Sequence, residues 1–346
     1  MDILERLLGD CFWGVVGVER GCEGVCLKRV TDVQMGHYEG CNDRWPLRAR
    51  CDAGCVLVFK TDSRVLDVSF SVVMGARQYL GLDVAVDGVV VRSVYVDDFA
   101  KPEKIVMTNN AQGDARVILA EAGRFGIRLF EYAEKKERTV CVYLPQSVAL
   151  AFTGVEVDEG ALVASVERPK RKLLCLGDSI TQGMDAKHPM TAYTTQLARL
   201  LDAELLNQGV GGHIFDVDSF DEGLAFDADV VTIAYGTNDW NGNKTVEEIQ
   251  NNVRAYLEKV TGRYPLADVY VLGPIWRTIG DEIRAGGNLW DFSQVILKTA
   301  QEFEGVTCVD GLALVPHQEH VLPDGTHPND EGFLHYALNV YRAIKK

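Results

Sequence analysis

Apolar and polar positions follow two different periods along the chain. Over residues 30–166 apolar residues alternate with polar ones or form short runs separated by turn residues, which is the period of β-strands. Asp87-Gly88 lies between two valine-rich runs, and this dipeptide predicts a two-residue hairpin turn. Long helical periods are missing here. This half therefore predicts an antiparallel β-sandwich, with strands over residues 56–59, 65–72, 82–86 and 138–144.

From Lys172 onward short apolar runs alternate with segments of helical period. The expected strands are 173–176, 203–206, 229–234, 269–272 and 306–309. The expected helices are 191–201, 245–262, 288–303 and a last one that begins at Pro328. Thr245-x-x-Glu248 forms a capping box at the start of the second helix. Such alternation predicts a parallel sheet covered by helices on both faces, with ligands beyond the carboxyl ends of the strands.

The change of period predicts two domains, a jelly-roll-like β-sandwich over residues 1–168 and an α/β domain over residues 169–346. The boundary falls in residues 167–172, a charged stretch that contains a proline. A length of 346 residues suits two domains, and an apolar content of 47% lets each of them bury a core.

The net charge of −15 narrows the range of partners. Nucleic acids and anionic membrane surfaces select positively charged patches, so we expect neither as a partner. The first residues lack a basic stretch leading into an apolar segment, and no apolar run approaches the length of a membrane span. We therefore expect a cytoplasmic protein that acts on a small molecule.

Nine cysteines are spread through the chain, and in a reducing compartment we expect them to be free thiols. Cys22-x-x-x-Cys26 and Cys51-x-x-x-Cys55 are the pairs closest to a zinc pattern. Neither has the usual two-residue gap, and no histidine lies at ligand spacing nearby. We expect no metal and no cofactor.

Four short motifs carry candidate chemistry. Taken singly, each has an ordinary structural explanation: a serine that caps a loop, a glycine-rich loop, a turn asparagine and a surface histidine. All four lie in expected loops, three of them directly after strands. In chain order they are Gly177-Asp178-Ser179-Ile180-Thr181, Asn207-Gln208-Gly209-Val210-Gly211-Gly212, Tyr235-Gly236-Thr237-Asn238-Asp239 and Asp324-Gly325-Thr326-His327-Pro328.

These motifs, in this order, resemble those of the SGNH (GDSL-type) hydrolases, and the resemblance covers residues 172–346. It implies a flavodoxin-like three-layer α/β fold and a serine esterase. A serine hydroxyl needs a base to become a nucleophile, and a carboxylate must orient that base. The resemblance implies Ser179 as nucleophile, His327 as base and Asp324 as its carboxylate. It also implies an oxyanion hole made by the backbone N–H groups of Ser179 and Gly212 and the side-chain amide of Asn238.

The arrangement is not that of the α/β-hydrolases, because Thr181 stands where the second glycine of Gly-x-Ser-x-Gly would be. Candidate substrate contacts are Trp240 and Trp276, since aromatic rings suit an acyl group or a sugar face, and His213, which directly follows Gly212. A β-sandwich ahead of an SGNH domain looks like the arrangement in some carbohydrate esterases that remove acetyl groups.

We therefore expect an enzyme that hydrolyses short-chain acyl esters, O-acetyl groups on a carbohydrate above all, through an acyl-enzyme. One alternative is a lysophospholipase or thioesterase for longer acyl chains. Another is a catalytically inactive carbohydrate-binding protein, against which the intact motif set argues. A phosphate-binding domain is weaker, because the glycine-rich motif lacks Gly-x-Gly-x-x-Gly spacing.

Overall fold

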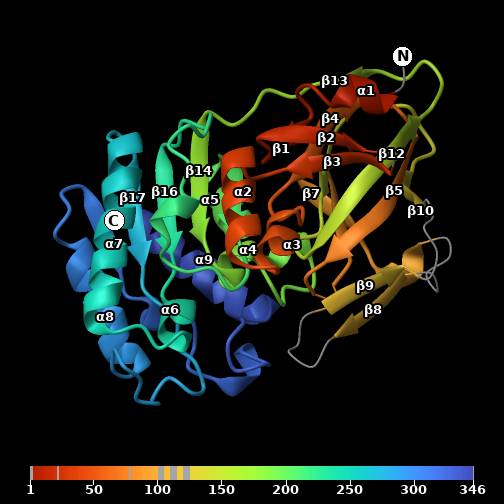
Figure 1. Cartoon of the computed structure of the whole chain (residues 1–346). Helices are drawn as coiled ribbons and strands as arrows, with labels where there is room; N and C mark the ends of the chain where they lie inside the picture. The colour runs from red at the N-terminus through yellow and green to blue at the C-terminus, as the bar shows by residue number, and fades with distance from the viewer. Residues whose placement is uncertain are drawn as a thin grey trace. The chain divides into compact units, whose positions relative to one another are not determined.

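The computed structural model describes residues 3–21, 23–77, 79–99, 105–109, 115–119 and 125–345, with no side chains described in 105–109 and 115–119. The chain divides into two compact units, whose elements are coloured along the chain in Figure 1. The first unit comprises Met1–Arg29, Arg50–Arg168 and Lys187–Met190. The second comprises Val30–Ala49, Pro169–Ala186 and Thr191–Lys346.

The first unit is built from antiparallel sheets. One sheet has the order β1 (Phe12–Trp13), β4 (Val56–Thr61), β11 (Arg138–Tyr143), β6 (Leu82–Val86) and β7 (Val89–Val94), with β13 (Val163–Ala164) also paired to β4. The other has the order β10 (Phe125–Glu131), β5 (Val65–Gly75), β12 (Val148–Val157), β3 (Gly24–Lys28) and β2 (Gly17–Gly21). Beside these lie a hairpin of β8 (Ile105–Asn109) and β9 (Ala115–Leu119), the helix α1 (Ile3–Leu7) and the 3-10 turn η1 (Val96–Asp98).

The period-2 pattern places one apolar core between the two larger sheets. Along β5, Leu66 and Phe70 are buried whereas Asp67 is partly exposed, as expected for a strand with one face in the core. Phe59 of β4 belongs to the same buried cluster, so both sheets contribute to it. The predicted β-sandwich is confirmed.

The predicted hairpin is confirmed as well. Asp87 and Gly88 connect β6 to β7, and their φ angles are +49° and +83°. Both residues therefore lie in the left-handed region, which two-residue hairpin turns of type I′ require and which glycine and aspartate tolerate.

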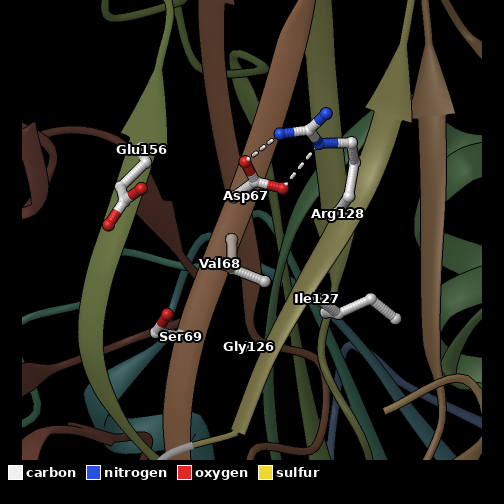
Figure 2. Close-up of a pocket in the computed structure, with 7 residues that line it drawn as sticks. All are labelled: Asp67, Val68, Ser69, Gly126, Ile127, Arg128 and Glu156. Atoms are coloured by element: carbon white, nitrogen blue, oxygen red, sulfur yellow. Dashed lines mark hydrogen bonds and ion pairs between the residues drawn. The ribbon is translucent and has the colours of Figure 1, made fainter. Parts of the chain in front are cut away.

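The outer face of strands β10, β5 and β12 carries a shallow depression, shown in Figure 2. Arg128 donates two hydrogen bonds of 2.9 Å to the carboxylate of Asp67. The residues that line the depression are Asp67, Val68, Ser69, Gly126, Ile127, Arg128 and Glu156. None of these lining residues is aromatic, so the depression has no ring on which a sugar could stack.

The second unit contains a five-stranded parallel sheet. Its order is β15 (Ala203–Gly209), β14 (Arg171–Gly177), β16 (Val230–Ala234), β17 (Asp268–Leu272) and β18 (Val306–Val309). In chain order this is 2-1-3-4-5, the flavodoxin-like order. Leu173 and Leu174 are both fully buried although neighbouring residues of a strand point to opposite faces, so both faces of the sheet are covered. The predicted fold class is confirmed.

Helices follow the strands as the alternation predicts. The long helix α7 begins after Thr245, whose side chain accepts a hydrogen bond from the N–H of Glu248 in the predicted capping box. Helices α5 and α9 share one apolar cluster with residues of the sheet, and α7 packs against α8. The helices of this unit are α2 (Asp32–Cys41), α3 (Trp45–Ala49), α4 (Ser179–Gln182), α5 (Tyr193–Leu201), α6 (Thr237–Asn241), α7 (Val246–Arg263), α8 (Leu289–Ala300) and α9 (Asp330–Ile344).

The prediction of only strands and turns from residue 30 onward is wrong over α2 and α3. Only Gln34 and Tyr38 of α2 are buried, so the helix has too few apolar positions to show a helical period. Its N-terminal signal is nonetheless present, because Thr31 and Gln34 form a capping box.

Among the described residues, no helix combines the length and apolar character that crossing a bilayer would require.

Candidate active site

The order of the strands places three of the four motifs together at the carboxyl ends of neighbouring strands. Strand β14 has β15 on one side and β16 on the other, so the connections leave it in opposite directions. At such a switch point the loops beyond the carboxyl ends separate and leave room for a ligand. Ser179 follows β14, Gly212 follows β15 and Asn238 follows β16.

Ser179, His327 and Asp324 form a continuous chain of hydrogen bonds. The Ser179 hydroxyl lies 2.8 Å from Nε2 of His327, and Nδ1 of His327 lies 2.6 Å from a carboxylate oxygen of Asp324. The other Asp324 oxygen accepts hydrogen bonds of 2.7 Å from the His327 N–H and 2.9 Å from the Thr326 N–H. A short turn therefore fixes the carboxylate against the imidazole, and the imidazole faces the serine.

The carboxylates around His327 favour a proton on Nδ1. Burial acts to raise the pKa of Asp324, but the hydrogen bond and charge of His327 and the two backbone N–H groups outweigh it and hold that pKa below its ordinary value. A second carboxylate, Asp185, has an oxygen 3.7 Å from the same Nδ1. With Nδ1 protonated, Nε2 is free to accept the proton of Ser179.

The glycine-rich loop that presents Gly212 is fixed from two sides. Gly212 has φ +78°, and a Cβ added to it would lie 2.7 Å from Nη1 of Arg48, so a side chain there would be both strained and crowded. The preceding Gly211 donates its N–H to the side chain of Gln182 at 2.9 Å, and its carbonyl accepts a hydrogen bond of 2.8 Å from Arg48. Asn207 accepts from the N–H of Gly209 at 2.8 Å.

The side-chain amide of Asn238 lies at the same end of the strands. Its nitrogen donates to the carbonyl of His213 at 3.0 Å and, over a long 3.3 Å, to the carboxylate of Asp178. The Ser179 N–H is at the first residue of α4, where a helix leaves N–H groups without an intrahelical partner. Donors of the types that stabilise an oxyanion are thus gathered near Ser179.

Asp178 and Asp239 brace these loops. Asp178 is the N-cap of α4 and accepts from the Ile180 N–H at 2.9 Å, and Asp239 accepts from the Phe215 N–H at 3.3 Å. Burial raises the pKa of Asp178 to about 6 and that of Asp239 to about 7.

Two of the three expected substrate contacts are buried, and we correct them. Trp240 is 0% exposed, donates its indole N–H to the carbonyl of Gly287 and lies beneath Arg284. His213 is also 0% exposed, because the rings of Tyr38, Trp45 and Tyr235 surround it.

Burial lowers the pKa of His213 to about 4. The third expected contact, Trp276, is partly buried, and its ring stacks on that of His317.

Arg277 and Arg48 are additional residues of this region. Arg277 is buried and donates hydrogen bonds of 2.8 Å to the side chains of Asn241 and Thr326. It thereby joins helix α6 to the loop that carries Asp324 and His327. Arg48 comes from α3, and no local pattern in the sequence connects it with a loop 163 residues further along the chain.

Two groups of side chains in the described part of the chain have the residue types and spacing of metal ligands. One is Asp185, Asp324 and His327, in which the histidine nitrogen already contacts a carboxylate. The other, outside this site, is His37, Cys41 and Asp216.

Part of the chain is similar in sequence to a known protein family. The sequence model of the GDSL-like Lipase/Acylhydrolase family matches residues 175–333. No curated protein sequence matches the chain.

Several solved structures share the fold. The salicylyl-acyltransferase SsfX3 from a tetracycline biosynthetic pathway is 19% identical, with a TM-score of 0.76 over 96% of this chain and 93% of that one. A protein described as a GDSL-like lipase from Bacteroides ovatus is 18% identical, with a TM-score of 0.71 over 96% and 94%. A family two carbohydrate esterase from Clostridium thermocellum is 14% identical, with a TM-score of 0.61 over 85% and 92%.

At these identities the likeness establishes the fold, whereas the family match establishes the class of the domain. Residues 175–333 include the motifs that carry Ser179, Gly212, Asn238 and His327. The chain therefore carries a hydrolase domain of the GDSL-like lipase/acylhydrolase family with the SGNH fold, and the protein is an enzyme of the esterase class.

Proposed function

We propose that the protein is a serine esterase that hydrolyses short-chain acyl esters, with O-acetyl groups on a carbohydrate as the substrate class. The observation that supports this most directly is the hydrogen-bonded series Ser179, His327 and Asp324, with contacts of 2.8 and 2.6 Å. A nucleophile, a base and an orienting carboxylate in this order are sufficient for ester hydrolysis through a covalent intermediate.

In the proposed acylation step, Ser179 Oγ forms a bond to the ester carbonyl carbon while its proton moves to Nε2 of His327. The carbonyl electron pair moves onto oxygen, and the N–H groups of Ser179 and Gly212 and the amide of Asn238 stabilise this oxyanion. The Asn238 N–H would turn from its long contact with Asp178 to the oxyanion. When the carbonyl re-forms, the bond to the alcohol oxygen breaks and His327 returns the proton to the departing alcohol.

The proposed deacylation step repeats this chemistry with water. His327 accepts a proton from water as the water oxygen attacks the acyl-serine carbonyl, and the same donors stabilise the second oxyanion. Collapse breaks the bond to Ser179 Oγ, the proton returns to the serine, and the carboxylic acid leaves.

Burial of the reacting groups favours a small acyl group. The Ser179 and His327 residues are only 7% and 8% exposed, so a slim group reaches the hydroxyl most easily. The negative charge of the chain favours a neutral substrate over an anionic one. The shared fold with family two carbohydrate esterases and with an acetyl xylan esterase from Butyrivibrio proteoclasticus supports acetylated sugars as the class.

A second candidate function is acyl transfer to an alcohol. It is favoured by the shared fold with SsfX3, a salicylyl-acyltransferase, over nearly the whole chain. The acyl-enzyme would be the same, and the acceptor would be an organic hydroxyl in place of water. Product analysis with and without an added alcohol distinguishes the two.

The test is hydrolysis of p-nitrophenyl esters from acetate to palmitate and of acetylated xylan, with wild type beside Ser179→Ala, His327→Ala and Asp324→Asn. We expect turnover to be highest on acetate and to fall with chain length. The Ser179 and His327 variants should lose at least about 10³-fold in kcat, and Asp324→Asn about as much because it favours the wrong tautomer of the histidine.

Retained turnover in Ser179→Ala would overturn the nucleophile assignment. A preference for palmitate would replace the substrate class by the longer acyl chains of lysophospholipases and thioesterases. Absence of turnover on every ester, together with binding of acetylated xylan, would favour the inactive carbohydrate-binding protein.

A further inference from the structure

A second cluster of side chains with ligand chemistry lies in the second unit, between helix α2 and the loop after β15. His37 and Cys41 are one turn apart on α2, so their side chains lie on the same face. Nε2 of His37 is 3.6 Å from Sγ of Cys41 and 2.7 Å from a carboxylate oxygen of Asp216. An imidazole, a thiol and a carboxylate from two distant parts of the chain therefore lie within 4.8 Å of one another.

His213 is a second, independent observation that points to a ligand. Its side chain is 0% exposed, and neither ring nitrogen has a hydrogen-bond partner among the residues that the structure describes. Buried polar atoms are nearly always hydrogen-bonded, because an unsatisfied one carries its full desolvation cost. Nε2 of His213 lies 4.0 Å from the same Asp216 oxygen that contacts His37. The unsatisfied nitrogen is thus turned toward the cluster.

We propose that His37, Cys41, Asp216 and His213 bind a zinc ion. Two imidazole nitrogens, a thiolate and a carboxylate are all ligands that Zn²⁺ accepts, and four of them complete a tetrahedral structural site. The thiolate and the carboxylate together balance the charge of the ion. Binding converts the Cys41 thiol to a thiolate, and the released proton goes to solvent.

The spacing of His37 and Cys41 fits this ion. Zn–N bonds of about 2.0–2.1 Å and Zn–S bonds of about 2.3 Å set tetrahedral N and S ligands roughly 3.6 Å apart. His37 Nε2 and Cys41 Sγ are at that distance, 3.6 Å. The Asp216 carboxylate lies 2.7 Å from Nε2 of His37 and 4.0 Å from Nε2 of His213, and of the four side chains only His37, Cys41 and Asp216 have all their ligand atoms within 4.8 Å of one another. Zinc binding therefore requires the Asp216 carboxylate and the His213 ring to move. Rotating the Asp216 carboxylate from His37 toward His213 lengthens the first distance and shortens the second.

The consequence is a link between α2 and the loop that contains Gly212. His213 is the next residue after Gly212, and Asp216 lies in the same loop. Zinc would hold this loop on α2 and raise the unfolding temperature of the chain. The inference does not rest on the proposed esterase activity, because none of the four side chains is in the proposed triad.

The experiment is zinc binding to the full chain after treatment with a chelator, measured by competition with a chromogenic indicator. Wild type, His37→Ala and Cys41→Ser are compared with His320→Ala and Cys308→Ser, which remove a histidine and a cysteine elsewhere. We expect one tight site in wild type and in both controls, and binding weakened at least roughly 10–100-fold in the two site variants. Cobalt replacing zinc should show a thiolate-to-metal charge-transfer band that Cys41→Ser abolishes.

Equal zinc affinity in wild type and Cys41→Ser would overturn the proposal, as would a cobalt spectrum without the thiolate band. Cys41 is exposed, so its serine variant is expected to fold. Ser179→Ala should bind zinc as wild type does, which separates this proposal from that of the catalytic serine.

Discussion

Asp239 is a buried carboxylic acid next to the proposed oxyanion residue Asn238. Its oxygens accept long hydrogen bonds of 3.3 Å from the Phe215 N–H, and it is 0% exposed. Burial therefore dominates and raises its pKa from 3.8 to about 7, against weaker lowering by the backbone hydrogen bonds. The folded protein favours the neutral acid, so Asp239 makes stability depend on pH.

The direction follows from the two pKa values. Between the unfolded-state pKa of 3.8 and the folded-state value of about 7, the native state holds a proton that the unfolded state has lost. This contribution is fully present at low pH and is lost as the pH rises through about 7. Wild type should therefore lose stability between pH 5 and pH 8. We expect Asp239→Asn, which keeps the shape without the charge, to lose about 2 kcal/mol less than wild type over this range.

Urea unfolding followed by tryptophan fluorescence measures this, because Trp240 is buried beside Asp239. The matched control is Glu304→Gln, which removes an exposed acid and should keep the wild-type dependence on pH. If Asp239→Asn and wild type lose stability equally between pH 5 and pH 8, burial does not hold the proton on Asp239.

At the residue scale the sequence predicts contacts within a short turn better than it predicts which side of a helix a residue faces. Asp324 and His327 meet because a turn brings residues three apart together. Trp240 is two residues after Asn238, but both lie on α6, where residues two apart point to opposite sides of the helix. Proximity in sequence therefore misplaced the tryptophan.

Helix α6 and the loop of residues 324–327 are joined by one buried side chain. Arg277 donates to Asn241 at the end of α6 and to Thr326 between the proposed carboxylate and base, each at 2.8 Å. We expect Arg277→Ala to lower kcat on p-nitrophenyl acetate by roughly 10–100-fold with a smaller change in KM, because displacement of about 1 Å is enough to misalign reacting groups.

Arg284→Ala is the matched control for Arg277. Arg277 and Arg284 both lie over the ring of Trp240. Arg284 donates to the carbonyl of Asn241, but among the hydrogen bonds described none connects it to Thr326. Its removal should change kcat much less. Equal losses in both variants would assign the effect to packing around Trp240 rather than to the position of residues 324–327.

At the scale of elements, a capping box marks the start of a helix even where the helix has too few apolar residues to show a helical period. The capping box at Thr245 marks the start of α7, where an amphipathic pattern follows. The same signal at Thr31 precedes a helix with only two buried residues, so the apolar period alone indicates nothing. Helix α2 is held by tertiary contacts such as the hydrogen bond of 3.1 Å between Gln34 and Gln208.

At the scale of the whole molecule, the alternation of strands and helices predicts the parallel sheet, and the resemblance to the SGNH hydrolases implies its flavodoxin-like architecture. The assignment of residues 30–49 to the second unit has no such local signal. It depends on contacts between parts of the chain more than 150 residues apart, including Arg48 with Gly211 and Gln34 with Ser219. Sequence patterns within a window carry no information on these pairs.

This division predicts how a shortened chain behaves. A fragment of residues 169–346 contains the whole parallel sheet and the proposed triad, but it lacks Val30–Ala49. Without that segment the apolar cluster of Val30, Tyr38, Ala49 and Val210 is lost, and His213 loses two of its three ring neighbours. We expect the fragment to unfold at a lower temperature than the second unit of the full chain, and to turn over p-nitrophenyl acetate less than a tenth as fast because the loop of Gly212 is no longer held. Thermal unfolding by circular dichroism and steady-state kinetics of the fragment, the full chain and full-length Arg48→Ala provide the comparison. A fragment with the unfolding temperature and kcat of the full chain would show that α2 and α3 contribute nothing to the site. An active full-length Arg48→Ala beside an inactive fragment would place the contribution in the apolar cluster rather than in the Arg48 hydrogen bond.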